Sequence, residues 1–279
     1  VDFEDYYHDK RRDMGIESPI FKIEALWKSY EKINSFCNKY LNSKKITFFT
    51  TGIVAKEAKD LINKIHKDGH EIACHYNYHD SIHKSSRSEF SYNLDKAIES
   101  ILNATGVKPK GFRAPNFDIK PEDKWAYEEI SKRFEYDSSY ITNLPLNKIC
   151  PTSELIFQNS VLKEFFIFSR SFLTKNFKLR SGGTFLKLFP VNFTIKTMQD
   201  CYEKGHYVIL YMHPYEFLED SEFMIPLKDF YNYSFPKNVI KYSRQIQWHM
   251  VGNSTIEKKI KKITSLFEHQ GTMQNILLN

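Results

Sequence analysis

The sequence contains few cysteines, and no two of them lie close together. Four occur among the 279 residues: Cys37, Cys74, Cys150 and Cys201. Structural zinc sites are built from closely spaced cysteines, so this spacing argues against a structural zinc knot. No other feature indicates an oxidising compartment, and we therefore expect the cysteines to be buried free thiols.

Long apolar runs are also absent. No stretch of about eighteen consecutive apolar residues occurs, which predicts that no helix of the chain spans a membrane. No signal peptide is recognisable, so we expect a cytoplasmic protein. The chain starts at Val1 inside a strand-like run, and we expect an upstream piece to be missing from it. Hydrophobic residues make up 41% of the chain, which predicts a sizeable core and argues against disorder.

The positive charge is not concentrated in one region. The formal net charge is +6, and the densest basic cluster is Lys258–Lys262 (KKIKK), within a predicted helix. A solvated helix face explains this cluster, and a patch for nucleic acid or lipid is the alternative. We expect no nucleic-acid partner.

Apolar periodicity predicts alternating helices and strands. Residues 21–41 carry apolar side chains three or four positions apart, as in an amphipathic helix. Ser86 and Glu89 form a capping box for a helix that continues to Leu102. Further helices are expected at 54–67, 121–133, 192–204 and 255–269, and strands at 46–50, 71–74, 110–112, 207–211 and just before Asp137. Strands alternating with helices predict a parallel α/β sheet or barrel.

Histidines gather in the segment Gly69–Asp80 (GHEIACHYNYHD). His75 and His79 are four residues apart at the end of a short apolar run. This spacing lets two imidazoles reach one metal ion, on a helical turn or on a tight loop. A catalytic zinc ion usually takes three protein ligands, so the pair is only part of a site.

Other reactive side chains also follow predicted strands. In a parallel barrel the carboxyl ends of the strands share one face, and that face carries the active site. The side chains expected to meet there are Glu4, Asp5, His75, His79, Arg113, Asp137 and His213.

These residue types suit hydrolysis assisted by a metal ion. Asp5 would complete a His-His-carboxylate metal site with His75 and His79. Glu4 would accept the proton of the attacking water, and His213 would protonate the leaving amine.

Two further residues would support that acid and base. Arg113 would pair with Glu4 and lower its pKa. Asp137 would orient His213 or raise its pKa, although the run Asp137–Ser139 could equally form an Asx or Ser turn.

The order of these segments resembles the polysaccharide deacetylases with a NodB homology domain (carbohydrate esterase family 4). The family's five motifs are matched, in chain order, by Asp2–Tyr6 (DFEDY, against TFDDG), His75–His79 (HxxxH), Arg113–Pro115 (RAP), Asp137–Ser139 (DSS) and Leu210–His213 (LxxH). The forms of these motifs are similar to those of the branch associated with bacterial exopolysaccharides and surface glycans, which carries a C-terminal extension.

The resemblance implies a distorted (β/α) barrel with fewer than eight strands over residues 1–217, and a C-terminal extension over residues 218–279 packed on it. It also implies N-deacetylation of an acetylated sugar, free, polymeric or linked to a carrier, with a divalent metal ion. Zinc is the expected metal, with cobalt or nickel as alternatives.

The chain departs from the family pattern around the expected cleft. Glu4 stands where most members have aspartate, and Tyr6 replaces a glycine and would narrow the cleft. The aromatic residue expected after the RAP motif is displaced to Phe117. The residues expected to contact the sugar are Tyr6, Tyr76, Pro115, Asn116, Phe117 and Leu210, although most aromatic residues pack into cores.

Two alternatives stay open beside a sugar N-deacetylase. A deformylase, or another hydrolase of non-peptide C–N bonds, would release a different acid, so acetate against formate separates the two. A catalytically silent carbohydrate-binding protein is the second alternative, and the departure at Glu4 motivates it.

Overall fold

The computed structural model of the protein describes residues 1–16, 20–119, 123–146, 162–172, 174–219, 221–230 and 234–278. A six-stranded parallel sheet runs through its centre in the order β1-β2-β3-β4-β5-β7. The strands are β1 (Asp2–Phe3), β2 (Thr47–Thr50), β3 (Glu71–Cys74), β4 (Gly111–Phe112), β5 (Tyr136–Asp137) and β7 (Lys163–Glu164). All residues of β2 and β3 are buried, as expected for parallel strands covered on both faces. The predicted α/β fold with a parallel sheet is confirmed.

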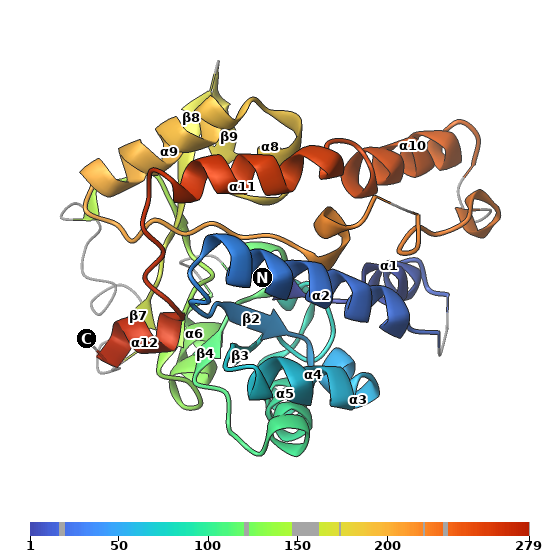
Figure 1. The fold of residues 1–279 in the computed structure, drawn as a ribbon. Helices are drawn as coiled ribbons and strands as arrows, with labels where there is room; N and C mark the ends of the chain where they lie inside the picture. The colour runs from blue at the N-terminus through green and yellow to red at the C-terminus, as the bar shows by residue number, and fades with distance from the viewer. Residues whose placement is uncertain are drawn as a thin grey trace.

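Helices connect and cover these strands (Figure 1). They are α1 (Tyr6–Asp13), α2 (Ile23–Tyr40), α3 (Gly52–Glu57), α4 (Lys59–Lys67), α5 (Arg87–Thr105) and α6 (Lys124–Ser131), with 3₁₀ turns η1 (Ile82–Lys84) and η2 (Pro115–Phe117). The Ser86 side chain caps α5 by accepting from the Glu89 amide, as predicted. The single helix expected over 54–67 is instead divided at Ala58, whose φ of −113° and ψ of 40° interrupt it. The helix expected from Pro121 starts at Lys124, and residues 121–122 lie outside the described residues.

A second, three-stranded sheet extends the fold beyond β7. It consists of β6 (Ile141–Thr142), β8 (Ile167–Phe172) and β9 (Thr174–Arg180), followed by α8 (Gly183–Leu188) and α9 (Val191–Glu203). The strand expected at 207–211 is reduced to one isolated bridge between Tyr211 and Gly182.

That bridge still brings the last motif to the sheet. The Asp2 amide donates to the Met212 carbonyl at 2.8 Å, so the chain before His213 runs beside β1. A Cβ on Gly182 would lie 2.2 Å from the Tyr211 carbonyl oxygen, so only glycine permits this approach. His213 is thereby carried to the carboxyl end of β1.

The C-terminal part is more ordered than the sequence suggested. Beyond the helix expected at 255–269, it contains α10 (Lys237–His249) and α12 (Met273–Leu278), and the expected helix is α11 (Ile256–Thr264). The 3₁₀ turns η4 (Pro214–Phe217), η5 (Leu227–Phe230) and η6 (Asn253–Thr255) connect these elements. Figure 1 shows α10 and α11 as a band beside α2, α8 and α9. One apolar cluster joins Phe36 of α2, Met198 of α9 and Ile260 of α11, so this band is part of the fold.

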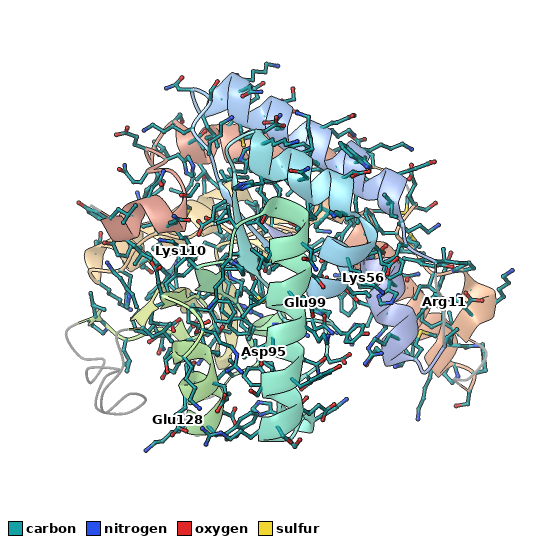
Figure 2. The ribbon with its side chains drawn as sticks, turned by 90° about the horizontal axis from the view of Figure 1, so that it is seen from below. Arg11, Lys56, Asp95, Glu99, Lys110 and Glu128 are labelled. Atoms are coloured by element: carbon teal, nitrogen blue, oxygen red, sulfur yellow. The ribbon has the colours of Figure 1, made fainter. Side chains whose placement is uncertain are left out.

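Two lysines in the basic run of α11 form hydrogen bonds with other parts of the protein. The Lys259 ammonium donates to the carbonyls of Leu186, Lys187 and Phe189 at the end of α8. Lys262 donates to the Asn192 side chain. Figure 2 shows other charged side chains, such as Asp95 and Glu99 of α5, on the outer faces of the helices.

Three of the four cysteines have the environment that the sequence predicts. Cys37, Cys74 and Cys201 are buried free thiols, and burial raises the pKa of each. Cys150 lies outside the described residues. Over the described ranges, no helix combines the length and apolar character that crossing a bilayer requires.

Candidate active site

Glu4, His75 and His79 form a buried cluster at the carboxyl ends of β1 and β3. Their ligand atoms all lie within 4.8 Å of one another. Glu4 Oε2 is 2.6 Å from His79 Nε2 and 3.6 Å from His75 Nε2. Glu4 is only 4% exposed, so this oxygen is shielded from solvent. A buried carboxylate oxygen this close to two imidazole nitrogens is an arrangement that suits a shared metal ion.

The His75 ring is held with one nitrogen free for that cluster. Its Nδ1 lies 2.8 Å from the Arg113 carbonyl oxygen, which can only accept, so Nδ1 carries the proton. The Nε2 atom therefore faces Glu4 and is the nitrogen with which His75 would bind a metal ion. A second hydrogen bond of this kind commonly orients metal-binding histidines.

The charges in the cluster stabilise one another. Burial alone would raise the pKa of Glu4, but the neighbouring His79 and His75 hold it well below the usual range. Burial would lower the pKa of His79, yet Glu4, with Asp9 and Asp2, raises it to about 9. Without a metal ion, a proton on His79 balances the Glu4 carboxylate. The donor set of two imidazoles and one carboxylate fits a divalent cation that displaces this proton.

Asp5 was predicted to complete the histidine pair, and the structure instead brings Glu4 to that place. The Asp5 carboxylate accepts from the amides of His8 and Lys22, and it caps the N-terminus of α1. Burial raises the pKa of Asp5 to about 6. Glu4 and Asp5 both follow β1, but the Asp5 carboxylate is turned to the start of α1, so Glu4 is the residue that reaches the two histidines.

Arg113 was predicted to pair with Glu4, and it pairs with Asp2 instead. Its Nη1 atom donates to Asp2 Oδ1 at 2.6 Å, and both side chains are nearly inaccessible to solvent. Ser138 holds the guanidinium in place, since its carbonyl and hydroxyl accept from Nε and Nη2. Burial would raise the pKa of Asp2, but Arg113, with His75 and His213, lowers it to about 2. Asp2 is therefore an ionised carboxylate beside the cluster, and the sequence interpretation overlooked it.

His213 is oriented by Glu216, and its charge interacts with those of Glu4 and Asp2. The Glu216 carboxylate accepts from the His213 amide at 3.1 Å, and its other oxygen is 3.4 Å from His213 Nδ1. Burial would lower the pKa of His213, but the fully buried Glu216 raises it. The role expected of Asp137 thus falls to Glu216, three residues after the histidine. The sequence indicates this contact only as a capping box, in which Glu216 follows His213 by three residues at the start of η4.

Asp137 is connected to the site through hydrogen bonds of Ser139. Its carboxylate accepts from the amide and hydroxyl of Ser139, which is the Asx turn weighed as the alternative. The Ser139 hydroxyl in turn accepts from the Ala114 amide, next to Arg113. Burial and the charge of Asp137 raise the pKa of neighbouring Glu164, so these two buried carboxyl groups share one negative charge.

The residues expected to contact sugar fall into two groups. Tyr6 and Phe117 are partly exposed near the cluster, and Phe117 packs edge-on against Tyr211. Asn116 is exposed, with φ of 57°. The other three are less accessible than expected, since Tyr76 and Pro115 are buried and Leu210 is partly buried against the cluster that joins α2, α9 and α11. Tyr76 stacks on Phe90 in the core, because its φ of 67° turns the side chain away from His75.

Comparisons with known families divide the chain into two parts. Residues 29–134 match the family described as polysaccharide deacetylase, and residues 148–276 match a domain of unknown function (DUF3473). His75, His79 and Arg113 fall in the first range, and His213 and Glu216 fall in the second. The candidate site therefore draws on both ranges and on the segment before them. The boundary at residue 217 stays a prediction.

Individual relatives resemble parts of the chain or its fold. The uncharacterized protein YlxY of Bacillus subtilis (strain 168) is 37% identical over 98 residues, which are 34% of this chain and 30% of that protein. The peptidoglycan-N-acetylglucosamine deacetylase of Bacillus cereus is 30% identical over 86 residues, 30% of this chain and 31% of that protein. The matches thus span about a third of each curated relative. A structure from Mycobacterium smegmatis, assigned as a polysaccharide deacetylase, aligns with a TM-score of 0.51 at 16% identity and covers 95% of this chain and 90% of its own, which shows a shared fold.

Proposed function

We propose that this chain, whose residues 29–134 match the polysaccharide deacetylase family, hydrolyses an N-acyl group on a sugar with the help of a divalent metal ion. The observation that carries the proposal is the buried cluster of Glu4, His75 and His79. The ionised Asp2 interacts electrostatically with His75, and His213 interacts with Glu4. A base and an acid beside a metal-binding cluster are the parts that amide hydrolysis needs.

Glu4, His75 and His79 would hold the metal ion, in place of the set with Asp5. When bound, the ion supplies Lewis-acid polarisation of the acyl carbonyl and makes water more acidic. Asp2 accepts the proton of the attacking water, and Arg113 keeps Asp2 ionised beforehand. His213 donates a proton to the departing amine nitrogen, and Glu216 fixes the ring that carries this proton.

The finer features of the substrate are part of the same proposal. We propose an N-acetyl group on a saccharide of a bacterial surface glycan or its precursor, with zinc as the metal ion. The support is the resemblance of the motifs and the Bacillus cereus relative, which acts on peptidoglycan N-acetylglucosamine. Partly exposed Tyr6 and Phe117 offer aromatic faces of the kind on which sugar rings stack.

Release of the acyl group tests this function. The purified chain, supplied with zinc, cobalt or nickel, is incubated with N-acetylated oligosaccharides, nucleotide sugars and lipid-linked sugars, and each product is weighed by mass spectrometry. We expect loss of one acetyl mass with equimolar acetate, and no release after chelation of the metal. Formate instead of acetate would establish a deformylase. Saccharide binding without any release would establish the silent carbohydrate-binding protein.

The contact between Glu216 and His213 predicts a change in pH dependence. Glu216 raises the pKa of His213, so the imidazole keeps its proton to a higher pH than it otherwise would. Glu216→Gln removes that charge, and the alkaline limb of kcat should move to lower pH, with a several-fold loss of kcat above pH 8. Glu219→Gln, which changes an exposed carboxylate three residues on, is the matched control. An unmoved alkaline limb in Glu216→Gln would show that the proton comes from another group.

A further inference from the structure

The end of α10 lies against the candidate active site. His249, the last residue of this helix, is 1% exposed, and its ring centroid lies 4.0 Å from that of Tyr6 and 4.3 Å from that of Tyr215. Tyr6 lies two residues after Glu4, and Tyr215 stacks on His213 with 5.0 Å between centroids and 11° between planes. One histidine from the C-terminal part thus contacts neighbours of both the metal cluster and the acid.

The ring of His249 packs against two tyrosine rings, tilted by 60° to Tyr6 and by 49° to Tyr215. Neither Nδ1 nor Nε2 has a hydrogen-bond partner, which is uncommon for a buried imidazole. Burial, together with the charges of Lys187 and His213, lowers the pKa of His249 to about 3, so the ring is neutral at physiological pH. A neutral ring does not repel the proton on His213, whereas a charged ring in the same place would.

Other side chains anchor the helix end, so the ring is not needed for that purpose. The Asn253 side-chain nitrogen lies 2.5–2.7 Å from the carbonyl oxygens of Tyr215, Leu218 and His249, and its two N–H groups donate to this set of acceptors. The buried Lys187 ammonium donates to the Trp248 carbonyl. These contacts fix the backbone of α10 against the loop after His213. The imidazole adds to this only its packing on the two tyrosine rings.

We propose that His249 is a positioning residue for the acid: it holds Tyr215 flat against His213, so that the domain of unknown function sets the geometry of proton donation. The inference rests on the proposed function, because it assigns His213 the proton for the leaving amine. Small displacements of a catalytic group lower its rate strongly, and aromatic pairs supply the rigidity that prevents them.

The test compares His249 variants with a matched control on the same helix. His249→Ala should lower kcat about tenfold with little change in KM, while His249→Phe, which restores a ring without nitrogens, should recover most of kcat. Combined with Tyr215→Ala, His249→Ala should add no further loss, because both act through one stack. The control is Gln245→Ala, which removes the hydrogen bonds to Ile225 and should lower Tm with kcat preserved.

Several results would overturn the proposal. Recovery by His249→Gln but not by His249→Phe would mean that the nitrogens contact the substrate directly. Equal kcat losses in His249→Ala and Gln245→Ala, or losses that add to that of Tyr215→Ala, would mean a general structural effect.

One measurement needs no substrate and separates this inference from the proposed function. The His213 ring protons, assigned by their loss in His213→Ala, are shifted in NMR spectra by the stacked Tyr215 ring. We expect these resonances to move in His249→Ala and to stay in Gln245→Ala. Unmoved resonances in His249→Ala refute the positioning role, whereas the absence of acyl release by the unaltered chain refutes only the deacetylase.

Discussion

Glu4→Ala is expected to abolish metal retention and turnover together. The substitution leaves His75 and His79 as a two-ligand fragment and removes the oxygen that approaches both rings. Loss of a direct ligand should weaken metal binding by more than the roughly 10- to 100-fold that changes in outer partners cause. Metal content after dialysis, measured by elemental analysis, and acetate release check both halves of the result.

The neighbouring carboxylate provides the matched control. Asp5→Ala removes the cap of α1 and the acceptor for the Lys22 amide, so we expect a loss of about 1–2 kcal/mol in the free energy of unfolding. Its metal content at a temperature where it stays folded should equal that of the unaltered chain. If Asp5→Ala lost the metal and Glu4→Ala kept it, the ligand would be Asp5, as the sequence first indicated.

The second large effect is expected for Asp2→Asn. This isosteric change removes the carboxylate that we propose as the base, so kcat should fall by about 10²- to 10⁴-fold while the metal stays bound. Arg113 then keeps a buried charge without its partner, which should cost about 3–5 kcal/mol in folding stability. Activity therefore has to be measured well below the melting temperature, with circular dichroism as the check on folding.

Two outcomes would contradict the role of Asp2. Metal loss in Asp2→Asn would make this carboxylate a ligand. Unchanged kcat with metal retained would move the base elsewhere, and Glu4, the base that the sequence first indicated, would be the next residue to test. In either case the contact between Asp2 and Arg113 would have only a structural role.

The sequence predicted the helices and the parallel sheet well, because their signals are local. The Ser86 cap, the apolar stripe of α2 and the short strands β2 and β3 each depend on residues within one or two turns. The strand expected at 207–211 was wrong except at Tyr211, which forms a single bridge to Gly182. Val208, Ile209 and Leu210 are partly buried and pack against neighbouring apolar clusters, and periodicity cannot distinguish such packing from strand pairing.

The sequence predicted which segments meet at the site, but it assigned some of the individual roles to neighbouring residues. Matching DFEDY position by position to the family motif made Glu4 the base and Asp5 the ligand. In the structure β1 ends at Phe3, Glu4 reaches the histidines and Asp5 caps α1. The sequence does not show where this short strand ends. The support of His213 by Glu216 was partly visible as a capping pattern, whereas the approach of His249 depends on packing between distant segments.

The contacts of the Asn253 side chain affect how chains of this kind can be recombined. Its side chain joins the carbonyls of Tyr215 and Leu218, just beyond His213, to the end of α10. A chimera that took the loop after His213 from one relative and the helix α10 from another would have to match these three acceptors. Crossovers placed between residues 134 and 148, where the two family matches leave a gap, would keep all three intact.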